Sequence, residues 1–135
     1  MFDSIFIGLE QVFHLQNIIF LTLGVFMGII FGALPGLTAT MGLALLVPFT
    51  FTMAPATGLI MLAGIYVGAM YGDSIPAILI NTPGTPAAIA TTFDGFPLSQ
   101  KGMAQHGLVA AAFSSSYGSL TANIVLALAA PPLAL

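Results

Sequence analysis

Long apolar stretches alternate with short polar or proline-containing breaks along this chain. Residues 11–72 carry no formal charge, and neither do residues 102–135. An α-helix rises about 1.5 Å per residue and the hydrocarbon core of a bilayer is about 30 Å thick, so these stretches are long enough for several membrane passes. The pattern therefore predicts an all-α, multi-pass integral membrane protein.

Prolines divide the first uncharged stretch into unequal segments. Residues 15–34 and residues 56–75 each have the length of a full membrane span. Residues 36–47, which precede Pro48, would extend only about 18 Å as a helix and could not cross a bilayer. We therefore predict a span, a half-span that is re-entrant or tilted, and a second span.

The two ends of the chain carry other patterns. Residues 1–14 place phenylalanine, isoleucine and leucine at helical spacing, with acidic side chains on another face, which predicts an amphipathic helix at the membrane interface. We assign the remainder, residues 15–135, to a membrane domain. Within it, residues 102–130 predict either one long helix or two shorter ones interrupted near residues 114–118.

Composition and charge agree with this picture. The chain has 135 residues, of which 59% are hydrophobic and 4% charged, whereas a soluble domain has about 25% charged residues. A single basic residue excludes electrostatic binding of nucleic acid, and the absence of cysteine excludes thiol chemistry and disulfides. That basic residue, Lys101, favours a cytoplasmic location for the loop predicted at residues 94–101.

Glycine recurs at every fourth position in both predicted spans. Such spacing leaves a stripe without side chains on one helix face, which lets helix backbones approach closely in lipid. We interpret the stripes as packing surfaces. They consist of Gly24, Gly28, Gly32 and Gly36 in the first segment, and of Gly64, Gly68 and Gly72 in the second.

Two Pro-Gly breaks, at residues 33–38 and 81–86, are the strongest candidates for a binding site. Irregular backbone survives at membrane depth only where protein shelters it or water reaches it, and a broken helix offers free N–H groups to an anion. The alternative is a tight turn outside the membrane. The candidate substrate-binding residues are Pro35, Gly36, Thr38, Asn81, Thr82, Pro83, Gly84 and Thr85.

The ionisable residues are few. Asp73 follows an apolar span, and we interpret it either as a cation or proton site or as an interfacial cap of the next segment. Asp94 precedes a glycine, which predicts a structural turn rather than an ion ligand. Both aspartates remain candidates for ion coupling. His14 and His106 are interpreted as interfacial, and no metal cluster or G-x-S-x-G elbow points to an enzyme.

Four stretches resemble the N-terminal portion of the large membrane subunit of tripartite tricarboxylate transporters, the TctA-type family. Together with the amphipathic start, the resemblance covers essentially the whole chain. The stretches are residues 28–37 (GIIFGALPGL), 65–72 (IYVGAMYG), 80–86 (INTPGTP) and 90–102 (ATTFDGFPLSQKG).

The resemblance implies a function that composition does not show. It implies a secondary transporter, a symporter that imports tricarboxylates, dicarboxylates or related organic acids across the bacterial inner membrane on a sodium or proton gradient, with no other cofactor. It also implies two partners, a small membrane subunit and a periplasmic solute-binding protein that delivers the substrate. The two Pro-Gly breaks would then lie on substrate-facing segments.

Two departures from the family pattern bear on this expectation. Gly72 is followed by Asp73 where the family usually has a second glycine, so the resemblance implies no ion-coupling role for Asp73. Members of the family are also much longer and contain two related halves. We therefore expect this chain to be a fragment or split subunit that needs the remaining part of the large subunit. The alternative is a truncated membrane scaffold that transports nothing; an ion channel ranks lower, because no filter-like loop repeats.

Overall fold

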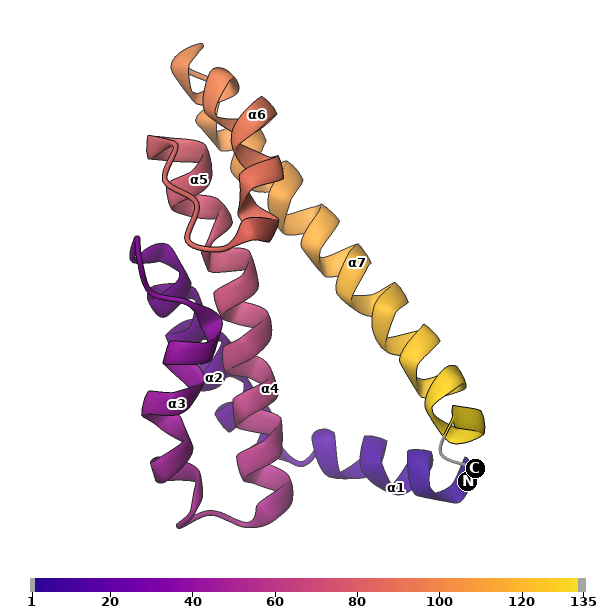
Figure 1. Ribbon diagram of the computed structural model, residues 1–135. Helices are drawn as coiled ribbons and strands as arrows, with labels where there is room; N and C mark the ends of the chain where they lie inside the picture. Colours follow the sequence, from indigo (N-terminus) through magenta and orange to yellow (C-terminus); the bar gives the residue numbers. More distant parts are fainter. Residues whose placement is uncertain (1, 134–135) are drawn as a thin grey trace.

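The computed structural model describes residues 2–133 of the chain and the side chains of residues 7–129. Seven helices and no strands make up this part of the protein, so the all-α fold class is confirmed (Figure 1). The helices are α1 (Phe2–Val12), α2 (Leu15–Ala33), α3 (Ala39–Thr50), α4 (Pro55–Gly72), α5 (Ser74–Ile80), α6 (Pro86–Gln100) and α7 (Ala104–Leu133).

Helices α2, α3 and α4 form an up-down-up bundle. The start of α3 lies beside the end of α2, where Gly42 faces Phe31, and its last residue, Thr50, lies beside Gly58 near the start of α4. Pro48 lies inside α3, so the predicted end of the half-span at this proline is wrong. Pro48 has no N–H to donate to the carbonyl of Ala44, and the helix continues for only two residues beyond it.

The glycine stripes of α2 and α4 face each other. A Cβ atom built on Gly28 would lie 2.2 Å from the carbonyl oxygen of Ile65, and one built on Gly68 would lie 2.3 Å from that of Val25. Only glycine allows two helix backbones to approach this closely. The predicted packing role is therefore confirmed for the six stripe glycines within α2 and α4. It is wrong for Gly36, which lies in the turn after α2, where a Cβ atom would have no described atom within 4 Å.

The hydrophobic core lies on the α3 side of this contact. Ile65 is fully buried and packs with Leu46 of α3 and Met61 of α4. Half-buried side chains of α2 and α3, including Phe31 and Leu43, surround them. The core therefore joins all three helices, and it holds α3 against the α2–α4 pair.

Helices α4 and α5 follow each other with little change of direction, as a rod over Pro55–Ile80 (Figure 1). Asp73, between them, keeps right-handed helical backbone angles. Pro76 does not end this segment as predicted, because it lies in the first turn of α5, where a helix needs no N–H donor from it. The rod ends at Asn81, which adopts the left-handed conformation with φ 57°, and the N–H of Thr82 closes it on the carbonyl of Pro76.

Helices α6 and α7 form an antiparallel hairpin that packs on α5. Asp94 and Gly95 lie inside α6, so the turn predicted at these residues is wrong. A Cβ atom on Gly95 would lie 2.7 Å from Cγ1 of Ile78, which shows that this glycine serves close helix packing. The turn lies further on, where Gly102 has φ 76°.

Helix α7 is one continuous helix of 30 residues, about 45 Å long, so the first of the two predicted alternatives is correct. Its serines do not break it, because the hydroxyls of Ser114 and Ser116 donate to the carbonyls of Ala111 and Ala112 in the preceding turn. In Figure 1 the second half of α7 diverges from the bundle.

Helix α1 runs sideways from the foot of the bundle (Figure 1). Its end is fixed by the buried side chain of Asn17, which donates to the carbonyl of Gln11 over 2.6 Å and accepts a hydrogen bond of 2.7 Å from the hydroxyl of Thr57. The predicted helix at the start of the chain is present. Its location at a membrane surface stays a prediction.

By length and composition, α2 and the α4–α5 rod could each cross a bilayer. Helix α3 is apolar but too short, at about 18 Å. Multi-pass insertion and re-entry of α3 therefore stay predictions, although α3 does lie beside two helices of membrane-spanning length.

Replacing Gly28 with alanine should destabilise the bundle, because the new methyl group would meet the carbonyl of Ile65. Overpacking of this kind costs about 1–3 kcal/mol. Gly118→Ala is the matched control, since α7 has nothing within 4 Å of that position. Thermal unfolding in detergent micelles should show a lower midpoint for Gly28→Ala alone. A Gly28→Ala midpoint equal to that of the unmodified chain would contradict the α2–α4 contact.

Candidate functional site

Asp73 holds the second Pro-Gly break in place. Its side chain is 3% exposed, and one carboxylate oxygen accepts a hydrogen bond of 2.6 Å from the backbone N–H of Gly84. The other oxygen accepts a hydrogen bond from the hydroxyl of Thr85. Asp73 makes no side-chain bond to the start of α5, so it does not cap the segment that directly follows it. It fixes instead the two residues before α6.

The two Pro-Gly breaks lie side by side at Asp73. A Cβ atom on Gly84 would lie 3.3 Å from the carbonyl oxygen of Leu37, which belongs to the break between α2 and α3. The same atom would lie 2.7 Å from the Asp73 carboxylate, so Gly84 is the residue that allows all three segments to meet. This junction lies between the α2–α3–α4 bundle and the α5–α6 pair (Figure 1).

Two helices begin at this junction. Thr38 is the N-cap of α3, and its hydroxyl accepts a hydrogen bond of 3.3 Å from the N–H of Met41. Thr85 is the N-cap residue of α6, and its hydroxyl donates to Asp73. Helix N-termini carry partial positive charge and free N–H groups. The junction therefore combines two positive helix ends with one buried carboxylate.

The remaining predicted residues are divided between this junction and its surroundings. Pro35 and Gly36 are exposed, and Gly36 turns the chain with φ 89°. Pro83 is half-buried in the second break. Asn81 and Thr82 are exposed at the far end of α5, where Asn81 lies about 12 Å from Asp73 along the helix axis. The structure therefore brings Gly84 and Thr85 to Asp73, but not Asn81 and Thr82.

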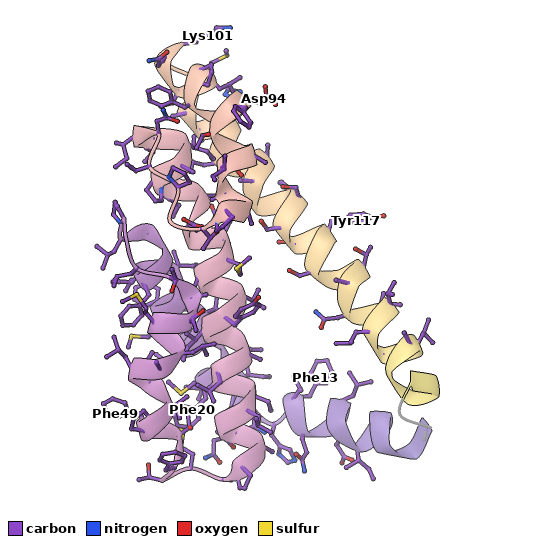
Figure 2. The ribbon with its side chains drawn as sticks, in the orientation of Figure 1. Phe13, Phe20, Phe49, Asp94, Lys101 and Tyr117 are labelled. Carbon is purple, nitrogen blue, oxygen red and sulfur yellow. The ribbon has the colours of Figure 1, made fainter. Side chains whose placement is uncertain are left out.

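Asp94 lies apart from Asp73. It is exposed on α6 and lines a cavity of about 370 Å³ between α5, α6 and α7. Figure 2 shows Lys101 beyond it, at the tip of the α6–α7 hairpin, so the one lysine of the chain is remote from the Pro-Gly junction. His106 is exposed near the start of α7, and His14 lines a separate polar cavity at the foot of the bundle.

Three hydroxyl-bearing residues were missed by the sequence reasoning. Ser74, Thr91 and Ser115 all line both the cavity beside Asp94 and a second cavity of about 290 Å³ that Asp73 and Thr85 also line. A signal was present for two of them. Ser74 directly follows Asp73 in the sequence. Thr91 precedes Asp94 by three residues, and this spacing places Thr91 and Asp94 on the same face of a helix. No sequence signal pointed to Ser115, because its place beside the cavities depends on how α7 packs against α5 and α6.

The sequence of this chain matches one protein family. A sequence model of the tripartite tricarboxylate transporter TctA family matches residues 18–135. The chain belongs to this family, the large membrane subunit of a tripartite system, and the resemblance seen in its motifs is confirmed.

One curated relative is the "Uncharacterized 52.8 kDa protein in TAR-I ttuC' 3'region" of Agrobacterium vitis, which is 44% identical to this chain over 132 residues. The match covers 98% of this chain and 26% of that protein, so the chain spans about a quarter of the relative's length. No solved structure matches the chain.

Removing the Asp73 carboxylate should release the second Pro-Gly break. A buried donor without an acceptor costs about 1–3 kcal/mol, so in Asp73→Ala hydrogen exchange of the peptide containing residues 81–86 should accelerate roughly tenfold. Asp73→Asn keeps one acceptor oxygen, so its exchange rate should lie between those of Asp73→Ala and the unmodified chain.

Asp94→Ala is the control, because Asp94 makes no bond to this segment, and its exchange should match that of the unmodified chain. Hydrogen–deuterium exchange followed by mass spectrometry measures all three variants. An unchanged rate in Asp73→Ala would show that the carboxylate does not hold the break.

Proposed function

We propose that this chain is the N-terminal part of the large membrane subunit of a secondary transporter that imports tricarboxylates, dicarboxylates or related organic acids. A sodium or proton gradient across the bacterial inner membrane drives the import. Membership of the TctA family supports the transporter class. The observation that carries the proposal is the meeting of two Pro-Gly breaks and two helix N-termini at one place in the fold.

A carboxylate ligand suits such a place on electrostatic grounds. The chain itself has a net charge of −3, and its one lysine is remote from the junction. Backbone N–H groups and hydroxyls must therefore supply the attraction. A helix N-terminus contributes about 0.3–1 kcal/mol when exposed and up to about 2 kcal/mol when partly buried, so several donors have to act together. Basic residues from the remaining part of the subunit would add to them.

Asp73 limits which donors the substrate can use. Its carboxylate already accepts the N–H of Gly84 and the hydroxyl of Thr85. We assign the groups around Asp73 to substrate binding. They belong to Pro35, Gly36 and Thr38 in the first break and to residues 81–83 in the second. Cations bound with the substrate offset the negative charges, and Asp73 and Asp94 are the carboxylates available to hold them.

The proposal includes partners and a membrane setting. Apolar side chains such as Phe113, Tyr117 and Leu120 are more than three-fifths exposed along α7. In the proposed assembly they face the lipid bilayer, the small membrane subunit or the remaining part of the large subunit. A periplasmic solute-binding protein delivers the substrate, and α1 lies along the membrane surface.

In the complete assembly, Asn81→Ala and Thr82→Ala should weaken uptake of labelled citrate at unchanged membrane abundance. Each variant loses a side-chain donor, which corresponds to roughly a two- to tenfold loss of apparent affinity. Asn81→Gly adds a sharper test, since glycine keeps the left-handed backbone that Asn81 adopts. A loss shared by Asn81→Ala and Asn81→Gly assigns the effect to the amide.

Proteoliposomes with and without a sodium gradient provide the measurement. Thr52→Ala is the control, because Thr52 is exposed in the α3–α4 turn and bonds only to the carbonyl of Phe49. Unaltered kinetics in both Asn81→Ala and Thr82→Ala would remove these residues from the site. Absence of uptake by the unmodified assembly would favour the non-transporting scaffold.

A further inference from the structure

Two adjoining cavities, here together called the wedge, lie between α7 and helices α4, α5 and α6, and they connect the two aspartates. The cavity beside Asp94 and the cavity beside Asp73 share three lining residues, Ser74, Thr91 and Ser115. Their volumes are about 370 Å³ and 290 Å³, and a water molecule in the liquid takes about 30 Å³. The wedge therefore has room for several waters or a partly hydrated ion along its whole length.

The residues that line both cavities carry hydroxyls without a hydrogen-bond partner among the residues that the structure describes. Ser74 is 8% exposed and lines both cavities, yet its hydroxyl bonds to no other residue in the part of the chain described. Thr91 and Ser115 likewise have no side-chain hydrogen bond within residues 7–129. Thr92, by contrast, donates to the carbonyl of Ile89 over 2.7 Å. Every fully buried polar side-chain atom in the described residues has a partner, so these three hydroxyls, which have none, are accessible to a ligand in the cavity.

The charge of the wedge is negative at both ends. Asp73 lies at the inner end and Asp94 at the outer end, and none of the residues lining either cavity is basic. An ionised carboxylate that is 3% exposed is costly without a positive partner, even when it accepts two hydrogen bonds. The wedge therefore favours a cation.

We propose that the wedge binds a monovalent metal cation, Na⁺, which enters past Asp94 and is held at the inner end by the Asp73 carboxylate and the hydroxyls of Ser74, Thr91 and Ser115. This inference rests on the proposed transport function and deepens it, since it names where the coupling ion binds. The donor set consists of oxygen atoms, which suit hard cations.

The small number of carboxylates selects a monovalent ion. Ca²⁺ takes six to eight oxygen ligands, commonly with several carboxylates, and transition metals favour histidine or cysteine. Within residues 7–129 no group of three or more His, Cys, Asp or Glu side chains could hold such an ion. One carboxylate at the inner end balances a single positive charge.

Occupancy of this site would reach the substrate through Thr85. Its hydroxyl gives its proton to Asp73 and keeps its oxygen lone pairs for a cation in the same cavity. A cation at Asp73 therefore contacts the second Pro-Gly break without breaking the hydrogen bonds that hold it. Binding of Na⁺ thus adds a contact to those that already hold the break.

Equilibrium binding of radioactive ²²Na⁺ to the full 135-residue chain in lipid nanodiscs tests the proposal. Thr91→Val removes one ligand at nearly constant volume and should weaken Na⁺ binding about tenfold, and Ser74→Ala should act in the same direction. Thr92→Val is the matched control on the next residue of α6 and should bind like the unmodified chain. Competition with KCl and CaCl₂ checks the selectivity for Na⁺.

Absence of saturable Na⁺ binding by the unmodified chain would overturn the proposal. So would equal affinities of Thr91→Val and Thr92→Val, or displacement of Na⁺ by a lower concentration of Ca²⁺. Binding needs no transport, so the two proposals can fail separately. Saturable Na⁺ binding by an assembly that takes up no organic acid would reject the proposed transport function and leave the cation site standing.

Discussion

The hydrogen bonds from Gly84 and Thr85 to the buried carboxylate of Asp73 determine how the halves of this structure are joined. The backbone after α5 leaves its helix at Asn81 and returns along α5, and these bonds fix Gly84 and Thr85 at Asp73. That point is where α6 begins and where the chain meets the carbonyl of Leu37. The carboxylate therefore helps to hold the second Pro-Gly break against the first, together with the packing of α6 on α5. The arrangement of candidate binding groups therefore depends on one side chain.

The glycine contact between α2 and α4 sets the position of that side chain. Because the two backbones touch at Gly28 and Gly68, the end of α2 lies beside the end of α4, and the first Pro-Gly break follows directly from it. Asp73 is the next residue after α4. The close α2–α4 contact, the first Pro-Gly break and the buried Asp73 thus follow one another along the axis of the bundle. Transporter-type sites are built in this way, since irregular backbone at membrane depth needs protein around it.

The sequence was sufficient to predict most of the helices, the packing role of most stripe glycines and the two breaks, because periodicity and Pro-Gly pairs act locally. It did not predict α6, whose second half lies where a loop was predicted at residues 94–101. It failed where the meaning of a residue depends on tertiary contacts. The helix ends predicted at Pro48 and Pro76 are wrong. Pro76 lies in the first turn of α5, where its missing N–H is not needed, and α3 continues for two residues beyond Pro48. Gly95 was taken as part of a turn, whereas it serves contact with Ile78. The convergence of the two breaks could not be predicted, because nothing local relates Leu37 to a residue far along the chain. Substrate contact at these residues is still a prediction.

Thiol cross-linking across the two breaks tests the central claim directly, since the chain has no cysteine of its own. Leu37→Cys combined with Pro83→Cys places one thiol in each break, and Leu37→Cys combined with Gln100→Cys is the control pair, with its second thiol at the end of α6. A short bifunctional thiol reagent applied to the protein in lipid vesicles, followed by peptide mass spectrometry, should join the first pair and leave the control pair unlinked. Failure of the first pair to react, with both thiols shown to be accessible to single-site labelling, would mean that the two breaks lie apart and would contradict this account.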